Sequence, residues 1–190
     1  MTPADIAQVL SDGGVAVIPT DTVYGLAAVP RIRDAVERVF ALKGRSETKG
    51  LPVLAADVAS LETVARFEDE AADLARRFWP GPLTMVLPRA GGFAASLGGP
   101  SDGTVAVRVP DRHVTLEILR LTGPLAVTSA NRSGAPPATT AAAAAAAFRA
   151  EIPVLDDGRL SGTVSTVLAL AGRRRVLREG AIAADELVRG

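Results

Sequence analysis

The chain has 190 residues, of which 48% are hydrophobic, and its formal net charge is zero because 21 basic residues balance 21 acidic ones. A balanced charge gives no overall field that would attract nucleic acid or an anionic membrane, so anion binding would need a local cluster of cations. The absence of cysteine excludes thiol catalysis, disulfides and cysteine-ligated zinc, and a single histidine excludes a multi-histidine metal site.

Length and terminal composition give expectations about organisation. A chain of this size is most simply one domain over residues 1–190, since domains commonly hold about 100–200 residues. Residues 1–14 carry acidic side chains rather than a basic leader, and no apolar run approaches the ~18 residues of a membrane span. We therefore expect a cytoplasmic protein without a membrane segment.

Apolar periodicity and the positions of Gly and Pro predict helices and strands that alternate along the chain. In chain order, the predicted elements are a helix from Pro3 to Gly13, a strand over 15–18, a helix from Pro30 to Phe40, a strand over 51–55, helices over 58–65 and 68–79, strands over 83–88 and 104–109, a helix over 113–121, a strand starting at Leu125, an alanine-rich helix to about Ala150, strands over 154–155, 165–170 and 175–180, and a helix over 184–188. This alternation predicts an α/β fold with a mixed sheet and flanking helices.

The most informative stretch runs from Leu125 to Thr140. It begins as a buried strand, continues in short hydroxyl and amide side chains, and ends at Thr139 and Thr140, which precede the alanine-rich helix as caps. A strand that ends in such donors and opens into a helix is a common ligand site in α/β proteins. The alternative is an ordinary connection in which these side chains satisfy the backbone of the turn.

Polar side chains recur at the ends of other predicted strands. They are Thr20, Thr22, Arg108, Ser129, Asn131, Ser165 and Thr166, with Lys43, Arg45, Lys49 and Arg178 in neighbouring loops. Strand ends gathered on one side of a sheet form a single crevice, and we expect these residues to surround it. Cations and hydroxyls without a nucleophile or metal cluster suit phosphoryl or nucleotidyl transfer, in which a protein supplies positioning and charge stabilisation.

Two common nucleotide-binding motifs are missing, since the sequence contains neither G-x-x-x-x-G-K-[ST] nor a G-x-G-x-x-G after a strand. A Ser-His-Asp triad would have to use His113. That residue stands at a predicted helix start, which favours a structural role.

Six motifs follow one another along the chain: PTDTVYGL, KGR with a lysine four residues on, PGPLTMVL, TVAVRVP, TSANRSG and LREGAI. In this order and spacing they resemble the YrdC/Sua5 family, the L-threonylcarbamoyladenylate synthases. The resemblance covers about Val9 to Ile182 and implies a twisted α/β sheet curved around a positive cavity. It also implies the short form of the family, without an extra C-terminal domain.

The reaction implied by this resemblance is a nucleotidyl transfer. L-Threonine, bicarbonate and ATP would give threonylcarbamoyl-AMP and pyrophosphate, with Mg²⁺ expected on the leaving pyrophosphate. A partner transferase complex would then pass the threonylcarbamoyl group to adenosine 37 of certain tRNAs, giving the t6A37 modification, and a weak direct contact with tRNA is a further expectation.

The resemblance also implies roles for individual residues, with no protein ligand for a metal. Contacts to L-threonine are implied for Thr22, Arg108, Ser129 and Ser165. Contacts to ATP are implied for Arg45, Lys49, Thr104, Asn131, Thr139 and Arg178. Lys43 and Arg45 are implied as catalytic residues on the phosphates, where, together with Arg178, they would neutralise charge while the threonine carbamate attacks the α-phosphorus.

Three positions depart from the family pattern. Lys49 stands where Asn or Lys is usual, Leu54 replaces a histidine that contacts threonine, and Val164 replaces the acid of the frequent GxEST motif. Two other functions remain open. An RNA-binding module is disfavoured by the zero net charge and by only seven aromatic residues, one Trp, one Tyr and five Phe. A carbamoyl-transfer domain, as in hydrogenase maturation proteins, would use carbamoyl phosphate instead of threonine.

Overall fold

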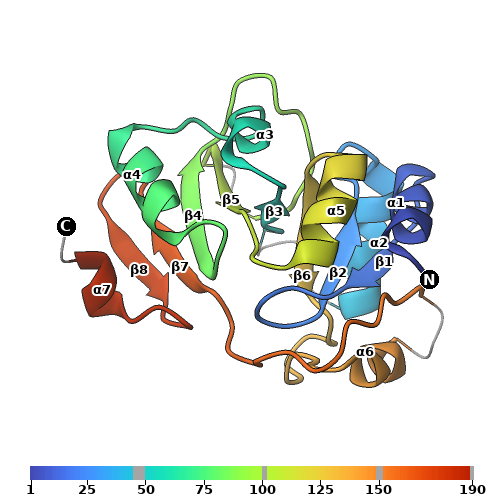
Figure 1. Ribbon diagram of the computed structural model, residues 1–190. Helices are drawn as coiled ribbons and strands as arrows, with labels where there is room; N and C mark the ends of the chain where they lie inside the picture. The colour runs from blue at the N-terminus through green and yellow to red at the C-terminus, as the bar shows by residue number, and fades with distance from the viewer. Residues whose placement is uncertain (45–49, 100–101, 149–151, 189–190) are drawn as a thin grey trace.

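The computed structural model describes residues 1–44, 50–99, 102–148 and 152–188. These residues form a twisted eight-stranded sheet with flanking helices (Figure 1). The strands are β1 (Ala16–Ile18), β2 (Gly25–Ala28), β3 (Val53–Leu54), β4 (Leu83–Pro88), β5 (Thr104–Arg108), β6 (Leu125–Ser129), β7 (Thr166–Ala169) and β8 (Arg175–Arg178). The helices are α1 (Pro3–Ser11), α2 (Arg33–Lys43), α3 (Val58–Glu62), α4 (Asp69–Phe78), α5 (His113–Thr122), α6 (Ala141–Ala147) and α7 (Ala184–Val188).

The sheet is mixed, which confirms the predicted fold class. Its strand order is β1-β2-β6-β3-β5-β4-β7-β8. The β3/β5 and β4/β7 pairs are parallel and the other pairs are antiparallel. In Figure 1, β1 and β2 lie toward the right of the view, and β7 and β8 lie at the left with α7 beside them.

Helix ends follow the capping signals of the sequence. Thr2 and Asp5 form a reciprocal capping box at the start of α1, each side chain accepting a hydrogen bond from the other's backbone N–H. Helix α2 ends at Gly44, whose φ of 58° lies in the left-handed region that glycine adopts without strain. This stop fixes Lys43 as the last residue of α2, with its side chain directed into the protein.

Alternate side chains of the strands enter two different cores. In β1, Val17 belongs to one hydrophobic cluster, while Ala16 and Ile18 belong to the other, as the period of two along a strand requires. Apolar residues of α2, α3 and α4 complete the first cluster, and those of α1 and α5 complete the second. Each face of the sheet therefore has its own set of covering helices.

The helices that pack on the face of the second cluster cover only part of the sheet. In β4 and β5, Met85 and Val107 point into the first core, whereas their neighbours Thr84, Ala106 and Arg108 line a cavity. Helices α1 and α5, which cover this face beside β1, β2 and β6, lie at the right in Figure 1 and do not extend to β4. The uncovered part of the sheet is where a ligand site can form.

Two strands differ from the prediction, and α2 begins and ends three residues later than predicted, at Arg33 and Lys43. Strand β2 was not predicted, because Gly25–Ala28 reads GLAA and these residues have low strand propensity. The strand forms because β1 and β6 pair with it on either side. Conversely, residues 154–155 make only an isolated bridge from Val154 to Val17, so they are not a strand of the described sheet.

Candidate functional site

A cavity of about 310 Å³ lies on the uncovered face of the sheet. It is at the lower end of the size range of small-molecule sites. Its lining includes the four residues predicted to contact threonine, Thr22, Arg108, Ser129 and Ser165, together with Arg178. These side chains come from the ends of different strands, so the predicted convergence is present for them and for Thr20. Thr166 does not line the cavity, because it is fully buried and its hydroxyl donates to the carbonyl oxygen of Ile182.

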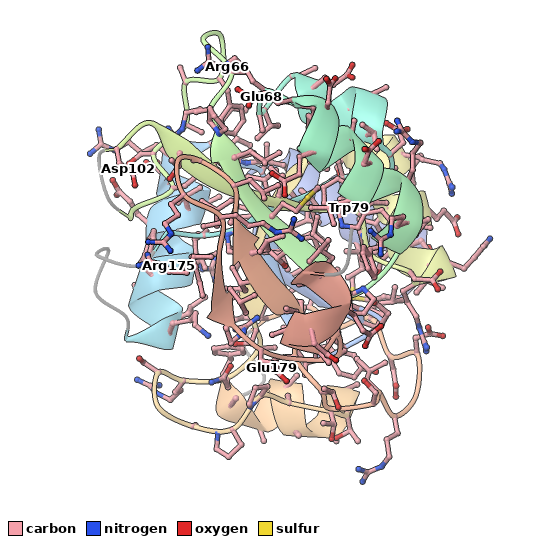
Figure 2. The ribbon with its side chains drawn as sticks, turned by 90° about the vertical axis from the view of Figure 1, so that its left-hand side faces the viewer. Arg66, Glu68, Trp79, Asp102, Arg175 and Glu179 are labelled. Carbon is pink, nitrogen blue, oxygen red and sulfur yellow. The ribbon has the colours of Figure 1, made fainter. Side chains whose placement is uncertain are left out.

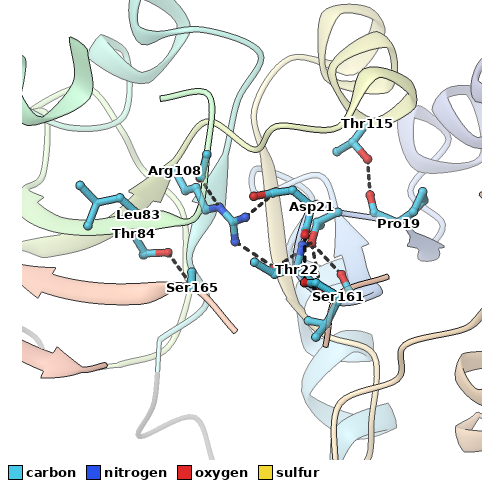
Figure 3. A network of polar contacts seen from close by, with 12 residues as sticks. Pro19, Asp21, Thr22, Leu83, Thr84, Arg108, Thr115, Ser161 and Ser165 are labelled. Carbon is cyan, nitrogen blue, oxygen red and sulfur yellow. Dashed lines mark hydrogen bonds and ion pairs between the residues drawn. The ribbon is translucent and has the colours of Figure 1, made fainter. Parts of the chain in front are cut away.

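Arg108 stands at the end of β5 with only 5% of its surface exposed. Its Nε donates to the carbonyl oxygen of Gly81 at 2.9 Å, and one terminal nitrogen donates to Thr22 Oγ1 at 3.3 Å. The other terminal nitrogen pairs with Asp21 Oδ1 (Figure 3). These partners use three of the five guanidinium N–H groups and hold the fork in one orientation.

The hydroxyl of Thr22 is also held in place. Thr20 Oγ1 lies 2.7 Å from the carbonyl oxygen of Val23, to which it can donate. Thr20 Oγ1 also lies 2.9 Å from Thr22 Oγ1, and either hydroxyl can supply the proton of this contact. Because Arg108 donates to Thr22 Oγ1 as well, this hydroxyl can make one further hydrogen bond, to a ligand.

A second set of contacts joins Ser165 and Arg178 on the other side of the cavity. Arg178 donates from Nε and a terminal nitrogen to the backbone oxygen of Ser165 at 3.1 and 2.8 Å, and from the latter nitrogen to Ser165 Oγ at 3.0 Å. Ser165 Oγ also lies 2.9 Å from Thr84 Oγ1. The hydroxyls of β4 and of the segment before β7 thus fix each other and the guanidinium of β8.

Burial and mutual repulsion both act against the positive charge in this cavity. Burial lowers the pKa of the Arg108 guanidinium, and the charge of Asp21 opposes that shift. Burial likewise lowers the pKa of Arg178, which the positive charge of Arg108 lowers further. Arginines nevertheless remain protonated, so an incoming anion would relieve an unfavourable concentration of positive charge.

Lys43 is directed at protein oxygens. It is 3% exposed, and its Nζ donates to the backbone oxygens of Ser129 and Asn131 at 2.6 and 2.8 Å and lies 3.4 Å from Asn131 Oδ1. Its own carbonyl oxygen accepts from the backbone N–H of Ser133 at 2.8 Å. Among the described contacts, Lys43 therefore holds the turn that follows β6, and its expected contact with phosphates stays a prediction.

Gly180 of the LREGAI motif packs directly against the backbone that carries Ser165. A Cβ at position 180 would lie 2.2 Å from the carbonyl oxygen of Val164 and 2.6 Å from the carbonyl carbon of Ser165. We expect Gly180→Ala to reduce the free energy of unfolding by about 1–3 kcal/mol, the usual range for overpacking. Denaturant titration measures this change.

The matched control for that substitution is Gly92→Ala, because a Cβ at Gly92 meets nothing within 4 Å. Its free energy of unfolding should change by less than about 0.5 kcal/mol, as for other surface substitutions. Equal losses in the two variants would contradict the close approach of Gly180 to the Ser165 backbone.

The remaining predicted ATP contacts lie in two neighbouring cavities. Asn131 and Thr139 line one of about 590 Å³, which shares Pro137 with the first cavity. Thr104 lines another of about 380 Å³, which shares Gly50 and Ala106 with the first. Asp102 and Arg175, which belong to the lining of this third cavity, lie on the same side of the molecule in Figure 2. Arg45 and Lys49 lie outside the described residues.

Sequence reasoning missed Asp21 and Thr84. Asp21 stands between two threonines that were singled out, and its own charge was the available signal. Thr84 interrupts the apolar strand β4 on the face opposite Met85, so a polar residue at this register position was also a readable signal. The departures Leu54 and Val164 both line the first cavity.

No helix in the described part of the chain is both long and apolar enough to cross a bilayer. The fold and the cavity define an α/β protein with a cationic, hydroxyl-lined cavity on an open sheet face. The family model Sua5_yciO_yrdC, described as telomere recombination, matches residues 8–180. The chain belongs to this family.

Similar proteins agree with that membership. A threonylcarbamoyl-AMP synthase of Pyrococcus abyssi is 39% identical over 186 residues, which are 95% of this chain and 54% of the relative. A threonylcarbamoyl-AMP synthase of Pseudomonas aeruginosa is 39% identical over 157 residues, 82% of this chain and 84% of the relative. The crystal structure of P. abyssi Sua5 complexed with L-threonine matches with a TM-score of 0.92 at 37% identity, covering 97% of this chain and 56% of that chain.

The chain therefore spans about half the length of the P. abyssi protein, in sequence and in structure. The similarity shows the family and the fold of the chain, and its activity is proposed below.

Proposed function

We propose that the chain is an L-threonylcarbamoyladenylate synthase, which converts L-threonine, bicarbonate and ATP into threonylcarbamoyl-AMP and pyrophosphate. The observation that carries this proposal is the convergence of Thr22, Arg108, Ser129 and Ser165 on one cationic cavity. Further support comes from relatives named threonylcarbamoyl-AMP synthase and from a similar structure complexed with L-threonine.

In this proposal the first cavity holds threonine. Arg108 receives the carboxylate, since a planar guanidinium binds a carboxylate with two parallel hydrogen bonds. The hydroxyls of Thr22, Ser129 and Ser165 complete the contacts, and Thr22 Oγ1 makes its one further hydrogen bond with the threonine hydroxyl. Leu54 makes part of the wall apolar, which suits the threonine methyl group.

ATP would occupy the space beside the first cavity. Asn131 and Thr139 line one adjoining cavity, Thr104 lines the other, and Arg178 lines the first cavity, which borders both. Arg45 and Lys49 are proposed to join from the segment after α2. Mg²⁺ would enter as part of its ATP complex, because phosphate oxygens commonly supply its ligands and the described residues hold no group of three carboxylate or histidine ligands.

The chemistry needs charge stabilisation more than a protein nucleophile. The threonine amine first combines with bicarbonate, losing water, to give the N-carboxylate. An oxygen of that carbamate then attacks the α-phosphorus of ATP, a P–O bond forms to the carbamate, and the bond to pyrophosphate breaks. Arg45 and Arg178 neutralise the developing negative charge, while Lys43 positions the turn that carries Ser129 and Asn131.

Pyrophosphate release with different amino acids tests the proposal. We expect release with threonine only when bicarbonate is present. Valine should react about 10⁴-fold less efficiently, because it leaves hydrogen-bonding groups of the site unpaired, whereas serine lacks only a methyl group and should lose about 10–200-fold in kcat/KM. Release that does not depend on bicarbonate, or that is equal for valine and threonine, would contradict the assignment.

The alternatives give different results in the same assay. A carbamoyl-transfer domain would use carbamoyl phosphate in place of threonine, and an RNA-binding module would show salt-dependent tRNA affinity without ATP turnover. We further propose delivery of the product to a tRNA-modifying transferase complex, a cytoplasmic location and a single-domain organisation. These three proposals rest on the sequence and the family.

A further inference from the structure

Asp21 is an acidic residue beside the cavity, whose lining includes its neighbours Thr20 and Thr22 and its ion-pair partner Arg108. It has no part in the proposed contacts to threonine or ATP. Its side chain is 14% exposed, compared with 6% for that of its partner Arg108. One carboxylate oxygen, Oδ1, pairs with a terminal nitrogen of Arg108 (Figure 3). The other, Oδ2, accepts no hydrogen bond from the described part of the chain, so it can bind a cationic group.

The position of Asp21 matches the geometry of an α-amino acid. In such a ligand the carboxylate and the ammonium are attached to the same carbon, so their receptors must be neighbours. Arg108 is the proposed receptor of the carboxylate, and Asp21 is in direct contact with it. The cations Arg108 and Arg178 can attract a carboxylate, but they repel an ammonium group.

The backbone around Asp21 holds it in place. Thr20 Oγ1 accepts from the backbone N–H groups of Thr22 and Val23, both at 3.2 Å, which closes a tight turn around position 21. Ser161 Oγ lies 3.3 Å from the backbone oxygens of Asp21 and Thr22. A carboxylate on a fixed turn beside a fixed guanidinium is a preorganised pair of opposite charges.

We propose that Asp21 binds the α-ammonium group of the substrate and thereby selects α-amino acids over other small carboxylates. This inference rests on the proposed function only in that the ligand of the cavity is an α-amino acid. When the substrate carboxylate reaches Arg108, Asp21 turns its free oxygen to the ammonium, and the four charges alternate in sign around the site. No bond is made or broken in this step.

Calorimetric titration without ATP tests the inference, with L-threonine and with L-3-hydroxybutyrate, which has the same carboxylate and hydroxyl but no amine. Wild-type protein should bind threonine at least 10-fold more tightly than the des-amino compound. Asp21→Asn should weaken threonine binding at least 10-fold and change binding of the des-amino compound less than 3-fold. Asp21→Glu, which keeps the charge, should retain a preference for threonine.

If Asp21 acted only as the counter-ion of Arg108, Asp21→Asn would weaken the binding of both ligands by the same factor. That result would overturn the inference. Unchanged threonine affinity would overturn it as well. Asp111→Asn removes an equal charge from an exposed position and should leave both affinities unchanged, and thermal melting checks that each variant is folded.

The two proposals fail in different ways. Wild-type protein could bind L-serine or L-alanine but not threonine, and Asp21→Asn could remove that binding. In that case the proposed substrate, L-threonine, would be wrong, and the role of Asp21 would be supported. If no α-amino acid bound, both proposals would be overturned.

Discussion

Replacing Lys43 with arginine is expected to lower kcat/KM of the proposed synthesis more than 100-fold, about as much as replacing it with methionine. The reason is geometric. The ammonium of Lys43 is a compact group whose three protons can point to three separate oxygens, and it lies within 3.4 Å of three oxygens of Ser129 and Asn131. A planar guanidinium is longer and wider and cannot take this buried position without moving the turn.

The composition of the chain agrees with this requirement. Lys43 and Lys49 are the only lysines in the sequence, and the other 19 basic residues are arginines. A chain that otherwise uses arginine retains lysine at a position where the structure needs an ammonium. For Lys43→Met we also expect a loss of about 1–3 kcal/mol in the free energy of unfolding. The carbonyl oxygen of Asn131 loses the Lys43 donor, whereas that of Ser129 still accepts from the backbone N–H of Asn131.

The experiment compares Lys43→Arg and Lys43→Met in the pyrophosphate assay and in denaturant unfolding. If Lys43 acted only as a positive charge on the phosphates, the arginine variant would retain much of the activity and the methionine variant would not. That difference would contradict the positioning role. Arg38→Met is the control, because Arg38 is an exposed cation on the same helix, α2, and its loss should change the free energy of unfolding by less than about 0.5 kcal/mol.

Replacing Arg108 is expected to have the second large effect. Arg108→Lys should weaken L-threonine binding by about 10–150-fold, because it loses charge-assisted hydrogen bonds that contribute roughly 1.5–3 kcal/mol each. A lysine ammonium cannot donate to Gly81, Thr22 and Asp21 and also form the paired contact with a carboxylate. Titration calorimetry measures the affinity, and Arg120→Gln on the exposed surface of α5 is the control.

Arg108→Gln separates binding from stability. It leaves the carboxylate of Asp21 without its partner, and removing one member of a buried ion pair commonly destabilises a protein by about 3–5 kcal/mol. Adding Asp21→Asn should recover much of that loss, because both charges are then absent. Threonine binding should stay weak in the double variant. Recovery of threonine affinity together with stability would show that Arg108 does not hold the substrate carboxylate.

Much of the local structure follows from the sequence alone. Some helix starts follow from their predicted caps, because a cap such as Thr140 acts through a hydrogen bond within a few residues. The polar strand ends at Arg108 and Ser129 were also readable, since a charged or hydroxylic side chain interrupts an apolar run there. Composition likewise excluded thiol and multi-histidine chemistry from the outset.

Only the tertiary structure decided which of these residues meet. Strand β2 has little strand propensity of its own and exists because two neighbours supply its hydrogen bonds. Lys43 at a helix end is explained locally by the helix dipole, and only the packed chain directs its ammonium to the turn after β6. Asp21 and Arg108 are 87 residues apart, and the sheet order brings them together. Local preferences act within a few residues, whereas such pairings result from many weak contacts formed by the whole core.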